Sequence, residues 1–457
     1  MKKILAVLVF VLLAACLVAP KFIASNYEEK VSQLVTNLNT APGYQVTMES
    51  LEDTWFTSKK VVHLAYDLAS IEPSLSGKKI EVDLILDAHY GPILLSANGL
   101  LGLFELHAYY AGDTLRDSLN WPADQAFYDA SVVMNLTGKI DVVDQIPAFD
   151  MADGNFTFSG YHGKGAFTDQ GIDYRSQVNQ VNLDKPYEKM SLTNTQLTIN
   201  IRNGVEALSS GGLYDGDIAF GFEQLTLGSQ DKPTELNIQG AKVLVSSLLD
   251  QTSQLGKIIN HYSVDKVSNA EFNADNLSFA VEITNLNNQF FLDYNTFLNS
   301  FLSEDDASAE EINLALIGFF TDKIEELLSH NPELNITDLS GHLAEGSFKA
   351  TVNSRLKDMA GPLSIEQLMD QNFWLWHLIL NGNLQADESL ITSLGERYLA
   401  QQMRTTVDSP QVKQQVQILL NNFIKQGLIQ REKDKLMTEI SIADGQGKIN
   451  NFPFPLM

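Results

Sequence analysis

The chain has 457 residues, and 57 acidic side chains against 31 basic ones give it a formal net charge of −26. Such an acidic chain is unlike a nucleic-acid-binding protein, because phosphate binding needs an electropositive face. A single cysteine excludes an internal disulfide and a thiolate metal cage. At roughly 150 residues per domain, the length predicts two to three domains or one elongated body.

The N-terminus has the pattern of an export signal. Lys2 and Lys3 precede an apolar run at residues 4–19, as in the charged and apolar regions of a secretory signal. In one interpretation the segment stays uncut as a single-pass anchor, with the lysines inside the bacterial inner membrane and the body in the periplasm. In the other, the Leu-Ala-Ala-Cys stretch at residues 13–16 is a lipoprotein processing site, and Cys16 takes the lipid.

The rest of the chain is predicted to be α+β and predominantly antiparallel β. Residues 1–24 are the signal anchor or lipoprotein signal, and residues 25–42 have the helical spacing of a stalk that ends at Pro42-Gly43. Residues 43–286 alternate apolar and polar side chains and contain tight-turn signals, which indicates an antiparallel β-rich region. Residues 287–457 are predicted to mix helices and strands, to continue the same elongated body and to end in a hairpin.

Helices in this last region are the candidates for covering the sheet. Apolar residues at spacings of three and four between Phe290 and Leu302 predict one helix, and residues 307–328 predict a second that is apolar almost all round and therefore buried. A third helical block begins near Ser389 and is interrupted at Ser409-Pro410. Half-buried alternation leaves one apolar face on each sheet, so something must cover that face.

Several short stretches in this order resemble the YdgA-like family of bacterial envelope proteins of unknown function. They are the N-terminal segment with its stalk, residues 46–64 around Trp55-Phe56, residues 87–94, residues 331–336 and residues 443–451. Tyr90 separates His89 from Gly91-Pro92, whereas the family pattern has the histidine next to the glycine. The resemblance implies an uncleaved N-terminal anchor and supplies no catalytic residue.

The sequence contains no recognisable set of catalytic, cofactor-binding or metal-binding residues. No two histidines lie at the spacings of a metal site, and no nucleophile elbow occurs. His89 beside Gly91-Pro92 is interpreted as a loop histidine. The glycine-rich segment at residues 160–165, which contains His162, is interpreted as part of a β-hairpin, since no helix follows to bind phosphate. Residues 373–377, rich in aromatic side chains, are predicted to form a strand buried on both faces.

The leading hypothesis is a non-enzymatic, membrane-tethered periplasmic protein that acts by binding or scaffolding. Its partners would be the inner membrane and a lipid or amphipathic envelope partner, with no nucleic acid and no cofactor. Two alternatives stay open. One is an envelope hydrolase whose dispersed active site would bring together His89, His107, His162 and His261. The other is a self-assembling structural protein.

Overall fold

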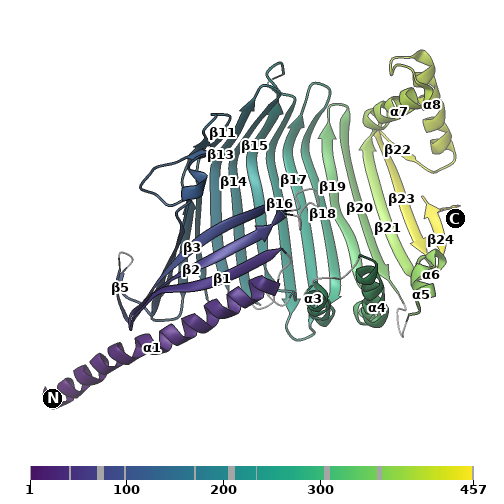
Figure 1. Ribbon diagram of the computed structural model, residues 1–457. Coiled ribbons are helices and arrows are strands. Elements are labelled where there is room, and N and C mark those ends of the chain that lie inside the picture. The colour runs from purple at the N-terminus through teal and green to yellow at the C-terminus, as the bar shows by residue number, and fades with distance from the viewer. Residues whose placement is uncertain are drawn as a thin grey trace. The chain divides into compact units, whose positions relative to one another are not determined.

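The computed structural model describes residues 2–40, 43–68, 77–96, 99–168, 171–203, 211–232, 234–302, 309–357 and 363–454 (Figure 1). The chain divides into two compact units. The first comprises Met1–Lys185, Thr193–Glu206 and Asn295–Ala309, and the second comprises Pro186–Leu192, Ala207–Tyr294 and Glu310–Met457. Strand β14 (Glu188–Asn203) and helix α3 (Asn288–Leu302) contribute residues to both units.

The first unit is an antiparallel sheet with one long helix. Its main strands pair in the order β1-β2-β3-β6-β8-β9-β12-β13. The long helix is α1 (Lys2–Thr40), and the main strands are β1 (Tyr44–Asp53), β2 (Thr57–Asp67), β3 (Lys79–Tyr90), β6 (Phe104–Tyr110), β8 (Tyr128–Met134), β9 (Ile140–Ile146), β12 (Tyr161–Phe167) and β13 (Ile172–Lys185). The short elements are β4 (Ile93–Ser96), β5 (Gly99–Leu101), a 3-10 turn (Asp113–Leu115), β7 (Leu119–Asn120), β10 (Phe149–Met151) and β11 (Phe156–Phe158).

Helix α1 covers one face of this sheet. Tyr27 and Val31 of the helix are buried in one cluster with side chains of β1, β2, β3, β6 and β8, including Val62 and Ala88. The Lys60 ammonium, which is buried beneath the helix, lies 2.5 Å from the Glu28 carboxylate. Because a buried charge is costly without a partner, this ion pair fixes the position of α1 on the sheet.

The strands of the second unit pair antiparallel in the order β15-β16-β17-β18-β19-β20-β21-β23. The bounds of its strands are β15 (Asp215–Gly228), β16 (Leu236–Asp250), β17 (Leu255–Ser268), β18 (Asn273–Asn287), β19 (Glu333–Leu343), β20 (Gly346–Leu356), β21 (Leu378–Asp387), β22 (Gln430–Glu432), β23 (Lys435–Ala443), β24 (Gln446–Ile449) and β25 (Phe452–Phe454). The helices are α4 (Ala309–Leu328), α5 (Ile365–Met369), α6 (Gln371–His377), α7 (Glu388–Met403) and α8 (Pro410–Lys425).

The predicted fold class is confirmed in its coarse form, because the described residues form mostly antiparallel strands with a few helices. The predicted helical block and closing hairpin correspond to α7, α8, β23 and β24. The prediction of a buried strand at residues 373–377 is wrong. This segment forms α6, whose first turn is capped by the Asp370 carboxylate accepting from the Asn372 amide, and Trp376 is exposed.

The helix predicted at residues 307–328 is present, but the prediction that it is buried is wrong. Helix α4 forms there, but Leu314, Ile317 and Phe320 are exposed. No helix among the described residues has both the length and the apolar character needed to cross a bilayer. The apolar run at residues 4–19 belongs to α1, but the side chains of residues 1–18 lie outside the described ones, Cys16 among them.

Candidate functional site

The candidate site is one face of the second unit's sheet, across which apolar residues line up from strand to strand. Residues paired across antiparallel strands share a face, so the register defines rows that run across eight strands. One row is Phe220, Val243, Tyr262, Phe279, Leu339, Ala350, Leu384 and Thr438. The next is Ile218, Val245, Asn260, Val281, Ile336, Val352, Gly382 and Ile440. The third is Gly216, Ser247, Ile258, Ile283, Leu334, Ser354, Leu380 and Ile442. We call these three rows the apolar face.

The opposite face of the same strands is polar. The row adjacent to that of Ile218 is Asp217, Ser246, Ile259, Glu282, Asn335, Asn353, Asn381 and Ser441. Two of its acidic side chains have partners: the Ser246 hydroxyl donates to Asp217 at 2.6 Å, and Glu282 lies 2.8 Å from Lys257 of β17. None of the three rows of the apolar face contains a charged side chain. The alternation along each strand therefore gives these strands one polar face and one apolar face.

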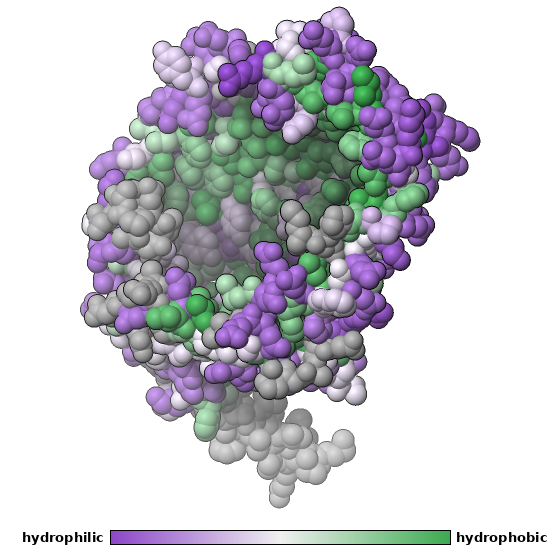
Figure 2. Space-filling view, turned by 90° about the vertical axis from the view of Figure 1, so that its right-hand side faces the viewer, coloured by the Kyte–Doolittle hydropathy of each residue, from purple (hydrophilic) through white to green (hydrophobic). Residues whose placement is uncertain are grey.

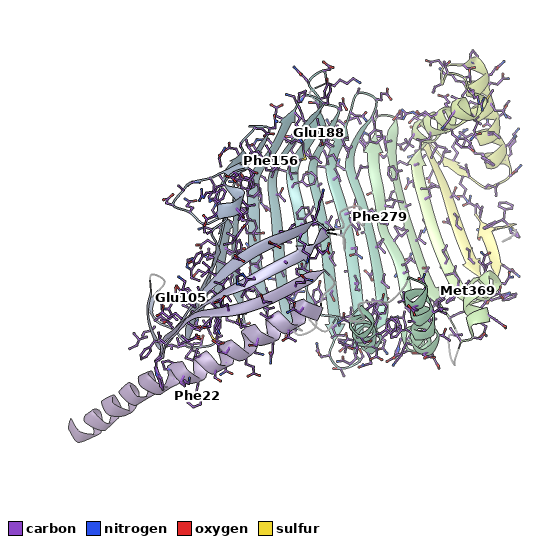
Figure 3. All side chains as sticks on the ribbon, in the orientation of Figure 1. Phe22, Glu105, Phe156, Glu188, Phe279 and Met369 are labelled. Atoms are coloured by element: carbon purple, nitrogen blue, oxygen red, sulfur yellow. The ribbon has the colours of Figure 1, made fainter. Side chains whose placement is uncertain are left out.

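Large side chains of the apolar face are exposed to a degree that is unusual for a sheet core. Between 36% and 49% of the surface of seven of them is exposed, namely Phe220, Tyr262, Phe279, Leu334, Leu339, Leu384 and Ile440. Figure 3 marks Phe279 among the side chains of β18, and its ring stacks on Tyr262 with centroids 6.1 Å apart. On the side of the molecule that carries β23 and β24, Figure 2 shows hydrophobic residues gathered in a hollow behind a hydrophilic rim.

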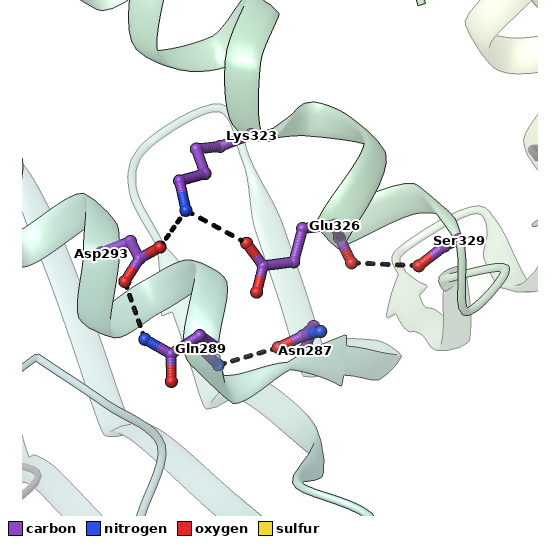
Figure 4. Close-up of polar contacts among 6 residues, drawn as sticks. All are labelled: Asn287, Gln289, Asp293, Lys323, Glu326 and Ser329. Carbon is purple, nitrogen blue, oxygen red and sulfur yellow. Dashed lines mark hydrogen bonds and ion pairs between the residues drawn. The ribbon is translucent and has the colours of Figure 1, made fainter. Parts of the chain in front are cut away.

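The helices of the second unit lie at the ends of the strands. Figure 1 shows α4 at one end and the α7–α8 pair at the other. Helix α4 packs against the first part of α3, where the ring of Phe290 lies 5.8 Å from that of Phe319 and that of Tyr294 lies 5.6 Å from it. Lys323 of α4 is paired with both Asp293 and Glu326 (Figure 4). The helices that the sequence offered as covers thus pack on one another and on strand ends.

The dimensions of the apolar face suit extended hydrocarbon. Eight strands about 4.8 Å apart make it about 34 Å wide, and three rows about 6.8 Å apart make it about 14 Å deep. One acyl chain occupies half of a hydrocarbon core that is about 30 Å thick, so it is about 15 Å long. The backbone groups of these strands are bonded within the sheet, and the polar side chains on the face are few. The face can therefore bind apolar groups but offers no acid, base or nucleophile in a reactive arrangement.

Three of the histidines named for the hydrolase alternative have a polar partner in the structure, and the alternative itself stays a hypothesis. His89 and His107 lie in the first unit, each beside its own carboxylate: His89 is 3.5 Å from Asp87, and His107 is 2.7 Å from Asp129. His261 belongs to the second unit and contacts Ser278 at 3.1 Å. His89 is part of β3, so the interpretation as a loop histidine is wrong. Within the described part of the chain, no group of three potential ligands is placed to hold a metal ion.

The glycine-rich segment forms strand β12 and leads into β13, as the β-hairpin interpretation predicts. Its glycines make room for a buried polar cluster: the Tyr174 hydroxyl donates to Asp144 at 2.8 Å and also contacts the Tyr161 hydroxyl. Burial raises the pKa of both phenols above the usual range, with the neighbouring Asp144 carboxylate adding to the effect. These tyrosines therefore stay protonated and act as hydrogen-bond donors that hold β9, β12 and β13 together.

Comparison with known proteins gives a family and no function. A family model described as "Bacterial protein of unknown function (DUF945)" matches residues 1–457. No curated protein matches the chain. No solved structure matches it either. A bacterial family of unknown function agrees with the resemblance seen in the sequence, and the narrower YdgA-like name stays a prediction.

Proposed function

The chain belongs to the DUF945 family of bacterial proteins of unknown function, and we propose from its geometry that it binds lipid acyl chains on the apolar face. The observation that carries this proposal is the row from Phe220 to Thr438, a line of uncharged side chains across eight strands in which Tyr262 and Leu384 are more than 40% exposed. Monomeric proteins rarely leave so wide a contiguous apolar surface uncovered without a ligand or partner for it.

Acyl chains fit the chemistry of this face better than a protein surface does. A protein interface makes about one hydrogen bond per 100–200 Å². In the first two rows of the apolar face, the only side chains that can form hydrogen bonds are Asn260, Thr438 and Tyr262. Each methylene that leaves water for this surface contributes about 0.8 kcal/mol and needs no polar partner. Hydrocarbon is the ligand that gains affinity here without leaving a polar group unpaired.

A membrane tether would place this face close to its lipid supply. We include in the proposal that the segment at residues 4–19 attaches the protein to the bacterial inner membrane, with the body in the periplasm. Its support is the sequence pattern of two lysines followed by sixteen residues without a charge. Attachment by lipidated Cys16 would serve the same purpose, and the acyl-chain proposal holds for either form.

The test uses two neighbouring residues of β17 whose side chains lie on opposite faces. Cells producing the full-length chain are fed a photoactivatable fatty acid, irradiated, and the label is mapped by peptide mass spectrometry after denaturing purification. We expect Tyr262→Asp to lower the label on peptides of β15–β21 by about tenfold, since burying an unpaired carboxylate under a ligand costs at least about 1.4 kcal/mol. Ser263→Asp, which places the same charge on the polar face, should leave the label unchanged.

Two results would count against lipid binding. The first is label confined to the N-terminal helix, with none on the strands. The second is an equal loss of label in Tyr262→Asp and Ser263→Asp, which would mean that the substitutions act by disturbing the fold. If cross-linking instead joined two copies of the chain through the apolar face, the self-assembling alternative would replace the proposal.

A further inference from the structure

Helices α7 and α8 form a hairpin in the second unit with an apolar cleft between them. The cleft has a volume of about 320 Å³. Its walls include Ile391, Tyr398 and Leu399 of α7 and Leu419 and Phe423 of α8. Ile391 and Tyr398 lie two turns apart on α7, and Leu419 and Phe423 lie one turn apart on α8, so each helix turns one apolar stripe toward the cleft. Leu390 of α7 and Val412 and Val416 of α8 are buried, and Val416 lies against Gly395 of α7.

The open side and the tip of the hairpin expose large apolar residues. Tyr398 is 62% exposed, and Phe423 is 42% exposed at the mouth of the cleft. At the tip, Met403 and Val407 are also exposed, and they flank Arg404, which ends α7 in a left-handed conformation. An arginine between exposed apolar side chains is typical of segments that dip into the headgroup region of a bilayer, where the cation stays at the level of the phosphates.

The sign of the charge reverses in this part of the chain. Residues 388–425, which form the hairpin, contain four basic and three acidic side chains, a net charge of +1, whereas the remaining residues carry −27. A body with that negative charge is repelled by anionic lipid, so contact with such a surface is favoured only where the local charge is positive. Among the ion pairs of the described residues, none engages Arg404 or Lys425.

We propose that the α7–α8 hairpin docks onto the surface of an anionic phospholipid bilayer. Met403, Val407 and the residues at the mouth of the cleft would enter the headgroup region, while Arg404 and Lys425 would contact lipid phosphates. This inference goes beyond acyl-chain binding on the apolar face, because it concerns the bilayer surface and a different element. Either one can fail while the other stands.

The test reads the environment of single side chains in the full-length protein. Replacing the only cysteine by Cys16→Ala allows one environment-sensitive fluorophore to be attached at Val407→Cys or, as the matched control, at Gln414→Cys. Gln414 lies on the exposed polar side of α8. With vesicles of phosphatidylglycerol and phosphatidylcholine, we expect a several-fold rise in emission with a blue shift at position 407 and little change at position 414. Pure phosphatidylcholine vesicles should give a much smaller rise.

Three outcomes would overturn the proposal. One is equal emission at the two positions, which would mean that only the N-terminal segment meets the vesicles. Another is an equal rise in emission at position 407 with both vesicle types, which would mean that lipid charge does not contribute to docking. The third is a rise at position 407 that depends on protein concentration and needs no vesicles, which would mean that a second copy of the chain occupies the hairpin. Adding Arg404→Glu should abolish the anionic preference while leaving the circular dichroism spectrum unchanged.

Discussion

A glycine on β12 decides whether the buried polar cluster of the first unit can form. A Cβ atom at Gly163 would lie 2.1 Å from an oxygen of Asp144 and 2.1 Å from the Tyr174 hydroxyl. These are the two groups that share the 2.8 Å hydrogen bond across the strands. Because Asp144 is buried, it depends on this bond in place of water. Gly163 is therefore required by space, whereas its backbone is that of an ordinary strand.

We expect Gly163→Ala to lower the free energy of unfolding of the first unit by about 1–3 kcal/mol, the usual cost of forcing extra volume into a packed site. Chemical denaturation followed by far-ultraviolet circular dichroism measures this change. The matched control is Gly382→Ala on β21, where the nearest atom to the added methyl group is 3.6 Å away, in ordinary contact. Equal midpoints for Gly163→Ala and the parent protein would contradict the role assigned to this glycine.

The sequence predicted fewer of the contacts between single residues than of the elements that contain them. It placed residues 160–165 in a hairpin, but the partners of Gly163 are 19 residues before it and 11 after it. The same holds for the contacts His63–Asp83 and His107–Asp129, whose members are brought together only by the strand register. Side chains that meet across strands cannot be paired from local pattern, because register depends on the whole sheet.

The contact between α3 and α4 combines aromatic packing with an ion pair. The rings of Phe290 and Tyr294 pack on Phe319, and Lys323 is paired with the Asp293 carboxylate (Figure 4). The hydrogen bond from Lys323, followed by that from Gln289, holds the pKa of Asp293 below its usual value. The same carboxylate raises the pKa of Lys323 above its usual value. The two shifts have opposite signs, as expected for a stabilising pair.

These shifts predict how the contact depends on pH. Asp293 contributes stability that is present above its unfolded pKa, about 3.9, and lost as the pH falls through its lower folded pKa. Lys323 contributes stability that is present below its unfolded pKa, about 10.4, and lost as the pH rises through its higher folded value. We therefore expect Asp293→Asn to destabilise the protein by no more than about 1 kcal/mol at neutral pH, because the pair is partly exposed.

The measurement is the free energy of unfolding of the parent and of Asp293→Asn between about pH 3 and pH 7. The difference between the two should shrink toward the acid end of this range. Asp322→Asn, which removes the same charge from an exposed position of α4, is the control. Its free energy of unfolding should change with pH as that of the parent does. A difference for Asp293→Asn that stays constant with pH would contradict the proposed ion-pair contribution.

At the scale of elements, local signals predicted most of what formed. Pro410 at the start of α8 and the apolar spacing of Val412, Val416 and Leu420 are visible in the sequence, and this helix is present. The error at residues 373–377 has a physical reason. A stretch as short as residues 373–377 has too few side chains for its periodicity to distinguish a strand from a helix. The Asp370 carboxylate caps the first turn and so favours the helix.

At the scale of the whole molecule, the alternation in residues 43–286 predicted sheets with one apolar face each. Whether such a face is covered depends on where the helices go, and the sequence pattern does not contain this information. In the first unit, α1 covers the face through Tyr27 and Val31. In the second unit, the helices pack on one another and at strand ends, and Tyr262, Phe279 and Leu384 stay partly exposed. The net charge of −26 makes copies of a chain with such a surface repel one another.

The most direct test of acyl-chain binding places a photo-cross-linking amino acid at Phe279 of the full-length chain in living cells. The matched control places it at Ser278, the preceding residue of β18, on the polar face. Irradiation should join lipid to the chain from position 279 and not from position 278, as seen by the added mass on the β18 peptide. Cross-links from position 279 only to protein, or equal lipid cross-linking from both positions, would contradict acyl-chain binding on the apolar face.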